Sequence, residues 1–378
     1  MQTRCVTEKE IEQQKELWPK TLEQIKNKKI EIENFLKSID YKNRRVVFTG
    51  AGTSEFVGNT IAPYLGTNFN SIATTDIVSN PNNYLKKSEK LLLVSFARSG
   101  NSPESLATVN LADEIVDDIC HILITCNGDG KLAVNKKDDP NSLVLLMPEK
   151  SNDKGFAMTS SFTCMALAGI TIFNLDKIES IEKNINYSIK AIVKNVEGID
   201  ALIESLIKLQ TSRIVYLGSS CLKGLAEEAA LKCLELTAGN MSLHYNSPLG
   251  FRHGPKSIVN DSTIIVMFLS NNLYTRKYEL DLLKEMYSEN KKKILVTIDM
   301  KNCEEAMENS HYYISLGEIE DSINEVFNMF PYVYFAQVFA LKKSLNYGIN
   351  PDNPCPTGEV NRVVQGVTIY EYKGEVKC

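Results

Sequence analysis

The stretch "RRVVFTGAGTSEFVG" (residues 44–58) joins a short run of β-branched and aromatic residues to a glycine-rich turn and the start of a helix. The stretch "SRIVYLGSSCLKG" (residues 212–224) has the same order of features. A continuous apolar strand followed by such a turn and a helix is typical of a parallel sheet that helices cover on both faces. Because the pattern occurs twice, the sequence predicts two similar α/β domains in tandem.

Three further pairs of apolar runs follow these two stretches in matching order. They are "LLLVSF" (91–96) with "TIIVMFL" (263–269), "CHILITC" (120–126) with "KKILVTI" (292–298), and "SLVLLMP" (142–148) with "HYYISL" (311–316). Alternation of such strands with helical stretches is the pattern of doubly wound folds. We therefore expect two tandem flavodoxin-like domains, each with a parallel sheet flanked by helices.

The composition of the connecting segments places the boundaries between these parts. Residues 187–210 contain no proline and one glycine, which favours a linker helix over a flexible tether. Apolar side chains recur at helical spacing in residues 8–39, and residues 346–370 hold three prolines and then a strand-like run that predicts an ordered tail. We expect a helical lead-in, two α/β domains and a tail, which span residues 1–40, 41–200, 201–350 and 351–378.

The composition excludes several classes of protein. The 378 residues are 43% hydrophobic and 24% charged, which is typical of a soluble globular protein. The net charge is -5 and no cluster of Lys and Arg with interleaved aromatic residues occurs, so we do not expect nucleic acid as a partner. The longest apolar stretch, residues 162–175, is too short to span a membrane, and the start of the sequence lacks the apolar core of a secretion signal. We expect a cytoplasmic protein.

Cysteine and histidine are placed as in a protein without a structural metal. The nine cysteines are scattered and lie mostly in apolar runs, which predicts reduced thiols. The four histidines, His121, His244, His253 and His311, lack the close spacing of a zinc site. We expect no metal, and we interpret all of these histidines except His253 as structural.

Polar side chains follow the first two strands of the first copy. In a doubly wound sheet, ligands bind at the carboxyl ends of the strands, where helix N-termini present free N–H groups. Two adjacent turns rich in hydroxyl groups are suited to a phosphate monoester, although a single such turn is equally typical of ordinary helix capping. The second copy has "SNNLYT" (270–275) after its second strand, so we expect only the first domain to bind phosphate. The predicted ligands are Thr53, Ser54, Arg98, Ser99 and Ser102.

A nucleotide cofactor is the alternative that a glycine-rich turn suggests. The turn "GAGTSE" (50–55) lacks the third glycine of the dinucleotide-binding fingerprint. The sequence therefore does not favour a dinucleotide.

The segment "EEAALKCLEL" (227–236) carries Glu228, Lys232 and Glu235 on a helix that is otherwise mostly apolar. Glu228, Lys232 and Glu235 fall on one face because positions i, i+4 and i+7 align. The other faces carry Ala229, Ala230, Leu231, Cys233, Leu234 and Leu236 and predict a helix packed on most sides. The charged stripe then faces a cleft, a charge network or a subunit boundary, and a surface ladder of ion pairs is the simpler alternative.

Several of these segments together resemble the sugar isomerase (SIS) family, which includes the isomerase half of glucosamine-6-phosphate synthase. They are "GAGTS" (50–54), "RSGNS" (98–102), "EEAALKCLEL" and "FRHGPKS" (251–257). The segments "PLGFRHGPKS" (248–257) and "NRVVQGVTIY" (361–370) are similar to the galactosamine-6-phosphate deaminase/isomerase branch, also named tagatose-6-phosphate ketose/aldose isomerase. The resemblance covers nearly the whole chain from Arg44 onward.

The resemblance implies a sugar-phosphate site. The five hydroxyl and guanidinium residues of the first domain bind the phosphate, with Ala97 in a position where relatives often carry a serine. A Ser/Thr loop offers Thr159, Ser160 and Ser161 to the sugar. Gln365 lies where the synthase relatives carry a lysine, and its neutral amide cannot form an imine or carry a charge, so we expect no catalytic role for the tail. At most Gln365 contacts the sugar as the tail closes over the site.

The resemblance also assigns the reaction, which converts galactosamine 6-phosphate into tagatose 6-phosphate and ammonia. Glu235 is the candidate base that moves a proton between C2 and C1. Lys232 stabilises the charge that develops on the intermediate, and Glu228 orients Lys232. His253 reaches the neighbouring subunit's site and assists ring opening, so we expect a homodimer or a higher homo-oligomer with a shared active site. No metal, nicotinamide or pyridoxal cofactor is expected.

Two alternatives remain open from the sequence. The protein could be a ketose/aldose phosphate isomerase that does not deaminate, or a non-catalytic sensor of sugar phosphates that regulates a partner. His253 could also be an ordinary turn residue bonded to backbone. The presence of Glu235 and the lack of a DNA-binding segment favour an enzyme that acts on a small sugar phosphate, without nucleic acid or membrane as a partner.

Overall fold

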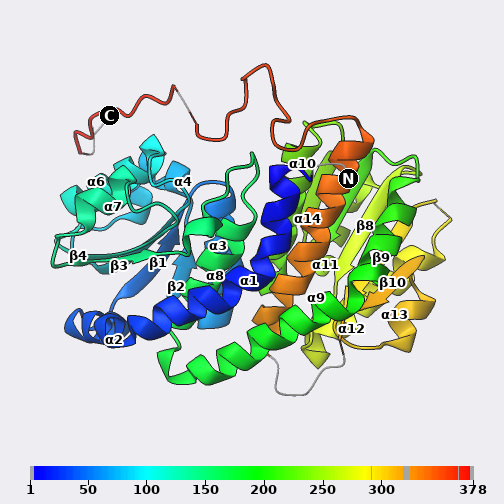
Figure 1. The fold of residues 1–378 in the computed structure, drawn as a ribbon, viewed down its shortest axis with the longest axis horizontal. Helices are drawn as coiled ribbons and strands as arrows, with labels where there is room; N and C mark the ends of the chain where they lie inside the picture. Colours follow the sequence, from blue (N-terminus) through cyan, green and yellow to red (C-terminus); the bar gives the residue numbers. More distant parts are fainter. Residues whose placement is uncertain (1–3, 291, 318–323, 365, 375–378) are drawn as a thin grey trace. The chain divides into compact units, whose positions relative to one another are not determined.

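A computed structural model of the protein describes residues 4–290, 292–317, 324–364 and 366–374. The chain divides into two compact units. The first, here called the N-unit, comprises Gln13–Lys154, Met158–Ile178 and the tail from Thr357. The second, the C-unit, comprises the residues up to Glu12, Gly155–Ala157 and Glu179–Pro356. Each unit contains one sheet (Figure 1).

The sheet of the N-unit has five parallel strands in the order β2-β1-β3-β4-β5. These strands are β1 (Arg45–Thr49), β2 (Phe69–Ser71), β3 (Lys90–Ala97), β4 (Asp118–Thr125) and β5 (Ser142–Leu146). This is the flavodoxin-like order, in which the chain reverses its direction of growth between β1 and β3.

The sheet of the C-unit repeats this topology. Its strands are β6 (Arg213–Leu217), β7 (Ser242–Asn246), β8 (Thr263–Phe268), β9 (Ile294–Asp299) and β10 (Tyr312–Ser315). They lie parallel in the order β10-β9-β8-β6-β7, which is the same order read from the opposite edge. The prediction of two tandem flavodoxin-like domains is confirmed.

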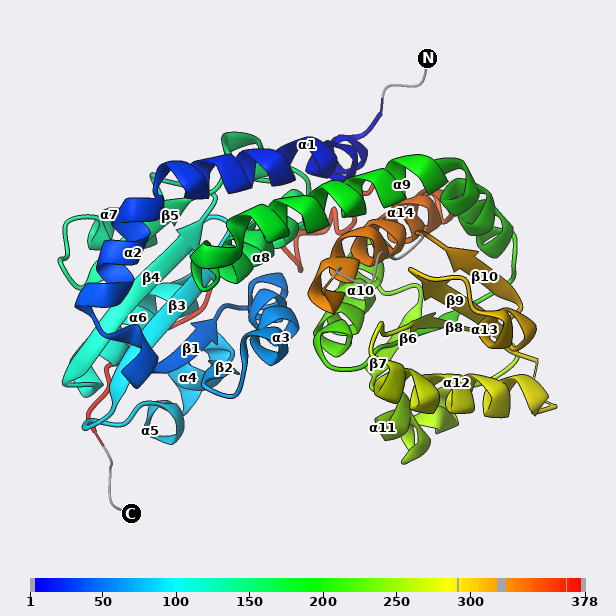
Figure 2. The same ribbon diagram turned by 90° about the horizontal axis from the view of Figure 1, so that it is seen from below.

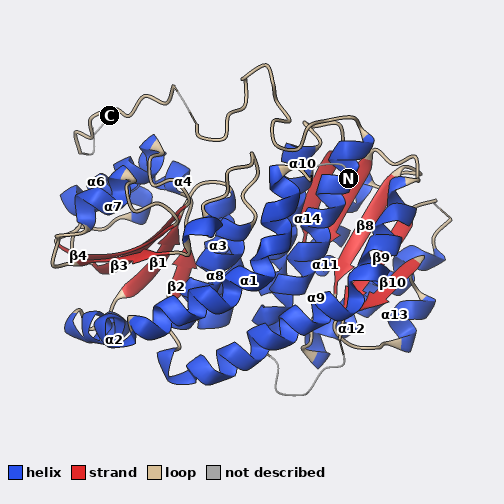
Figure 3. Ribbon diagram, viewed as in Figure 1, coloured by secondary structure: helices blue, strands red, loops and turns tan. Residues whose placement is uncertain are grey.

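Helices flank both sheets (Figure 3). In the N-unit they are α2 (Lys29–Ser38), α3 (Thr53–Leu65), α4 (Thr74–Ser79), α5 (Pro81–Tyr84), α6 (Pro103–Ile115), α7 (Lys131–Lys136) and α8 (Ser160–Ile172). In the C-unit they are α10 (Cys221–Leu236), α11 (Pro248–Arg252), α12 (Leu273–Ser288), α13 (Glu304–Glu308) and α14 (Met329–Asn346). Figure 2 shows α10 and α14 on one face of the C-unit sheet and α12 on the other. The helices α1 (Val6–Asn27) and α9 (Ile178–Ile207) each have residues in both units.

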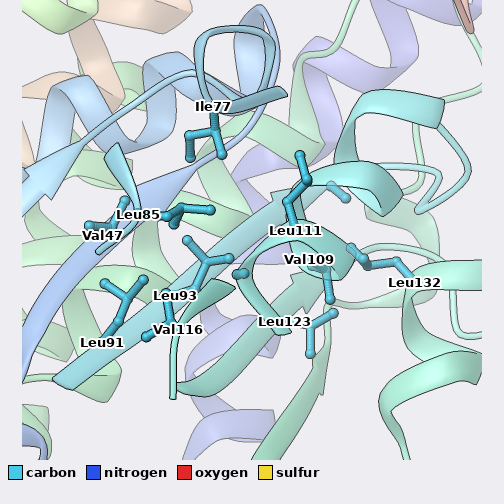
Figure 4. Close-up of a cluster of buried hydrophobic side chains, with 12 residues drawn as sticks. Val47, Ile77, Leu85, Leu91, Leu93, Val109, Leu111, Val116, Leu123 and Leu132 are labelled. Atoms are coloured by element: carbon cyan, nitrogen blue, oxygen red, sulfur yellow. The ribbon is translucent and has the colours of Figure 1, made fainter. Parts of the chain in front are cut away.

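The core of the N-unit forms where alternate strand residues meet the covering helices. Leu91 and Leu93 of β3 point to the same face because side chains alternate along a strand, and they pack with Val109 of α6 and Ile77 of α4 (Figure 4). An equivalent cluster in the C-unit joins β6, β8 and β9 to α12. Burial of both sheet faces explains why the strands read as continuous apolar runs.

The structure also corrects some details of the prediction. The edge strands β2 and β7 were not predicted, because neither is an apolar run and none of their residues is fully buried. The strand-like run in the tail is not a strand in its described residues, 363–364 and 366–370. Helices α1 and α2 lie within the predicted lead-in, and α9 covers most of the predicted linker segment 187–210, while the bounds of the domains stay a prediction. None of the described helices is long and apolar enough to cross a membrane.

Candidate active site

Two turns of the N-unit lie at the point where the strand order reverses. The first turn leads from β1 into α3, and its backbone requires glycine at two positions. A Cβ atom on Gly50 would lie 2.4 Å from the carbonyl carbon of Ser54, and Gly52 has φ 55° and ψ -127°. This tight turn brings Thr53 and Ser54 to the first turn of α3, where both are buried. The N-terminus of such a helix is suited to an anion.

The second turn leads from the neighbouring strand β3 into α6. Ser102 is the N-cap residue, and its hydroxyl lies 2.9 Å from that of Ser105. The hydroxyl of Ser99 accepts a hydrogen bond from the backbone N–H of Asn101 at 3.3 Å. Arg98 is buried, and its guanidinium donates to the carbonyl of Arg362 at 2.7 Å. The structure thus brings the five predicted phosphate ligands to two turns that follow paired strands.

Arg362 in the tail is a residue of this region that the sequence analysis missed. Its carbonyl accepts from Arg98, and its guanidinium donates to the carbonyl of Asp153. Further along the tail, the hydroxyl of Tyr372 donates to Asn82. The tail is therefore attached to the N-unit at the turn after β3 and again at α5. The sequence could have pointed to Arg362, since the segment "NRVVQGVTIY" places this charged residue directly before a mostly apolar run.

Asp153 is the second missed residue, and it organises the predicted Ser/Thr loop. Its fully buried carboxylate accepts from the backbone N–H groups of Thr159, Ser160 and Ser161 at 2.8–3.1 Å. It also accepts from the hydroxyl of Ser161 at 2.6 Å and that of Thr159 at 3.3 Å. This carboxylate satisfies the N-terminal donors of α8, as an N-cap does.

The three hydroxyl residues predicted to contact the sugar are thus fully buried and already hydrogen-bonded within the N-unit. Thr159 and Ser161 donate to Asp153, and the hydroxyl of Ser160 accepts from Gln13 at 3.0 Å. The fourth predicted sugar contact, Gln365, lies outside the described residues.

The charged stripe of α10 is a buried charge network. Glu228 and Lys232 are fully buried, while the side chain of Glu235 is 25% exposed. The ammonium of Lys232 lies 2.5 Å from a carboxylate oxygen of Glu235 and 3.7 Å from one of Glu228. A surface ladder of ion pairs is excluded, because such pairs are solvated on exposed helix faces.

The carboxylates of Glu228 and Glu235 lie in different environments. A buried ammonium is stable only with close partners of opposite charge, and Lys232 has one on each side along the helix. Glu235, alone of the three, keeps contact with solvent. Most of the apolar residues between these charges are buried, as expected of a helix packed on most sides, but Leu234 is 44% exposed.

His253 follows α11, and its side chain is exposed. The backbone around it is fixed, because Phe251 is fully buried and Arg252 pairs with Asp281 and Glu285 of α12 at 2.8 Å. The hydroxyl of Ser247 caps α11 by accepting from the N–H of Gly250. A rigid backbone that holds an imidazole in solvent suits a residue that acts on a bound molecule.

Two of the other histidines bind within the fold, and the third, His244, packs beside the rings of Tyr245 and Phe251. His121 is buried, with Nε2 2.7 Å from a carboxylate oxygen of Asp113, and His311 accepts the N–H of Leu295. Among the described residues, no group of three or more His, Cys, Asp or Glu side chains could hold a metal ion. The eight described cysteines are free thiols.

Comparison with known proteins gives consistent results. A model of the SIS domain matches residues 41–175. The D-galactosamine-6-phosphate deaminase AgaS of Escherichia coli is 42% identical over 373 residues, which cover 97% of this chain and 96% of that protein. The crystal structure of a protein from Clostridium novyi NT, assigned as a tagatose-6-phosphate ketose/aldose isomerase, is 50% identical with a TM-score of 0.91 and covers 97% of this chain and 95% of that chain. The structure of tagatose-6-phosphate ketose/aldose isomerase from Escherichia coli is 38% identical with a TM-score of 0.88 and covers 98% of this chain and 97% of that chain. With this similarity over nearly its whole length, the chain belongs to the SIS family, in the branch that contains the galactosamine-6-phosphate deaminases.

Proposed function

We propose that the protein is an amino-sugar phosphate deaminase/isomerase that converts galactosamine 6-phosphate into tagatose 6-phosphate and ammonia. The names of the relatives at 38–50% identity support this substrate and product. The observation that carries the proposal is the network on α10, where a fully buried lysine lies between a buried and a partly exposed glutamate. A protein that needed only a stable helix would be served as well by apolar side chains there.

In this proposal the N-unit turns hold the phosphate. Thr53, Ser54, Ser99 and Ser102 supply hydroxyl groups, and the N-termini of α3 and α6 supply backbone N–H groups. Arg98 adds a positive charge that is already oriented by its hydrogen bond to the tail. The hydroxyls of Thr159, Ser160 and Ser161 take part only if the sugar displaces one of their present partners.

The chemistry is then assigned to the C-unit. His253 gives a proton to the ring oxygen as the sugar opens to its aldehyde form. Glu235 removes the proton from C2, which gives an enolamine, and returns it to C1, which leaves an imine at C2. Water adds to the imine and expels ammonia, so the net reaction is hydrolysis of a C–N bond. Lys232 stabilises the negative charge that develops on the oxygen at C1, and Glu228 keeps Lys232 in position.

The partners in this scheme are the sugar phosphate and a second subunit that supplies His253, and the residues assigned to the steps require no metal or organic cofactor. We also propose a cytoplasmic location, because the described cysteines are free thiols and reduced thiols persist in that compartment.

The alternative is an isomerase that does not deaminate, which the names of two related structures favour. Incubation of the pure protein with galactosamine 6-phosphate, glucosamine 6-phosphate and galactose 6-phosphate, with assays for ammonia and ketose phosphate, separates the possibilities. Ammonia and ketose phosphate in equal amounts from galactosamine 6-phosphate support the proposal. Ketose phosphate without ammonia, formed from galactose 6-phosphate, supports the isomerase, and no turnover of any substrate supports a sensor.

The role of Glu235 is tested with Glu235→Gln, which keeps the shape of the side chain and removes the base. We expect kcat to fall by about 10²–10⁴-fold with little change in the binding of the sugar phosphate. A variant with full activity would refute the role of Glu235.

A further inference from the structure

The C-unit contains the same pair of turns at its own reversal of strand order, between β6 and β8. A Cβ atom on Gly218 would lie 2.4 Å from the carbonyl oxygen of Leu222, as one on Gly50 would meet Ser54. Ser220 has φ 53° and ψ -125°, which is nearly the conformation of Gly52. The backbone that presents the N-terminus of α3 to an anion is therefore retained at α10.

Glu325 occupies the second of these turns. One oxygen of its carboxylate accepts from the backbone N–H groups of Asn271 at 2.8 Å and Asn272 at 3.1 Å, and from the hydroxyl of Ser270. Its other oxygen lies 3.8 Å from the sulfur of Cys221, the first residue of α10. A single carboxylate thus contacts the start of α10 and the donors that precede α12.

Glu279 adds a second carboxylate from α12. It is fully buried and accepts from the hydroxyl of Ser219 at 2.6 Å, in the turn after β6. It also accepts from the backbone N–H of Ser270 at 2.8 Å, in the turn after β8. The two glutamates therefore take donors from both turns, as the oxygens of one bound phosphate would.

A cationic residue at the second turn is already paired with a carboxylate. Arg276 donates to both oxygens of Asp299 and to the carbonyl of Ser270. A phosphate at these turns would lie beside the carboxylates of Glu279 and Glu325, and Arg276 is already bound to the carboxylate of Asp299. These charges disfavour phosphate binding.

We propose that the C-unit keeps the anion-binding turns of the repeat and that Glu325 and Glu279 fill them in place of a phosphate. The two domains then differ because the C-unit supplies a carboxylate of its own where the N-unit would bind phosphate. A turn that binds no phosphate does not need the Ser-Gly-x-Ser sequence of the N-unit. The inference concerns the C-unit alone and does not depend on the reaction proposed above.

The test removes the built-in anion and offers inorganic phosphate. To silence the N-unit turns, Ser99→Ala and Ser102→Ala are placed in every protein compared. In that background we expect Glu325→Ala to bind one phosphate per chain by equilibrium dialysis. We also expect its Tm to rise by about 5 °C at a phosphate concentration near 100 times Kd, relative to chloride at equal ionic strength. The background protein should show neither effect, and an equal response in both would overturn the proposal.

Glu325→Gln is the matched variant, since its amide keeps the shape and an oxygen acceptor but not the charge. We expect no phosphate binding, because the side chain still fills the turns, and a Tm several degrees below that of the background protein, because charged acceptors bind N–H donors more strongly. A Tm equal to that of the background protein would show that the charge is irrelevant and would refute the proposal. This second readout applies even where Glu325→Ala fails to fold.

Discussion

Ser220 has a backbone conformation that belongs to glycine. Positive φ with strongly negative ψ is adopted by glycine in tight turns and costs other residues about 1–3 kcal/mol. Ser220 stands in a tight turn, because a Cβ atom on Gly218 would lie 2.4 Å from the carbonyl oxygen of Leu222. The first copy of the repeat has Gly52 at this point and carries no such cost.

Replacement of Ser220 by glycine should therefore stabilise the protein. We expect the free energy of unfolding to rise by about 1 kcal/mol, since relief of the strain exceeds the added entropy of the unfolded chain. Urea denaturation of Ser220→Gly and the parent measures this. Gly52→Ser is the control, with an expected loss of about 1–3 kcal/mol. A Ser220→Gly protein less stable than the parent would contradict the argument.

Glu279 should make stability depend on pH. Burial, aided by the charge of Glu325, raises the pKa of Glu279 from 4.5 to about 7 against the opposing effects of Ser219, the N–H of Ser270 and Arg276. The raised pKa means that the native state keeps its proton longer than the unfolded state. This contribution is fully present below pH 4.5 and is lost as the pH rises through about 7, with a size on the order of 3 kcal/mol.

Glu279→Gln has no proton to lose at this position. The free energy of unfolding of the variant, measured by urea denaturation from pH 4.5 to 8, should fall less steeply with pH than that of the parent. Parallel curves for the two proteins would exclude Glu279 as the source of the dependence.

At the scale of elements, α10 combines a structural and a chemical task. Its apolar residues pack within the C-unit, and its charged stripe buries Lys232 between two glutamates. Lys232→Met should cost about 3–5 kcal/mol, because it removes the ammonium from the buried carboxylate of Glu228. The double variant Glu228→Gln/Lys232→Met should recover most of this loss.

Activity separates the two tasks of the stripe. Both the single and the double variant should remain nearly inactive in the ammonia assay if Lys232 stabilises the intermediate. Recovery of activity together with stability in the double variant would assign Lys232 a purely structural role.

The start of α8 depends on a single side chain. Asp153→Ala removes an acceptor that binds three backbone N–H groups and two hydroxyls, so we expect a loss of about 3 kcal/mol in urea denaturation. Asp153→Asn retains one oxygen acceptor and should lose less. If both variants lost under 1 kcal/mol, Asp153 would not be the residue that fixes this loop.

At the scale of the whole molecule, we propose a homo-oligomer in which His253 serves the site of a neighbouring subunit. The exposed side chain on a fixed backbone supports this proposal. Mixed oligomers of Glu235→Gln and His253→Ala subunits should then regain part of the activity that each variant lacks alone. Absence of rescue in oligomers shown by mass spectrometry to be mixed would contradict a shared site.

The sequence by itself determined the class of fold, because continuous apolar strands that alternate with helices can be buried only in a covered parallel sheet. It also located the turns after β1 and β3, since glycine and hydroxyl residues at strand ends have a local cause. The strands β2 and β7 were missed because they are short on apolar residues and only partly buried, so backbone hydrogen bonds hold them and no apolar pattern marks them in the sequence.

Only the tertiary structure decided how the polar residues are used. Asp153 and Arg362, distant in sequence, both contact the turns and loop of the N-unit, and no local pattern pairs residues so far apart. The same holds for Glu279 and Glu325, whose carboxylates lie at turns that precede them in the chain by up to about a hundred residues. Burial and hydrogen bonding between distant residues depend on which surfaces pack together, and these surfaces are in contact only in the folded chain.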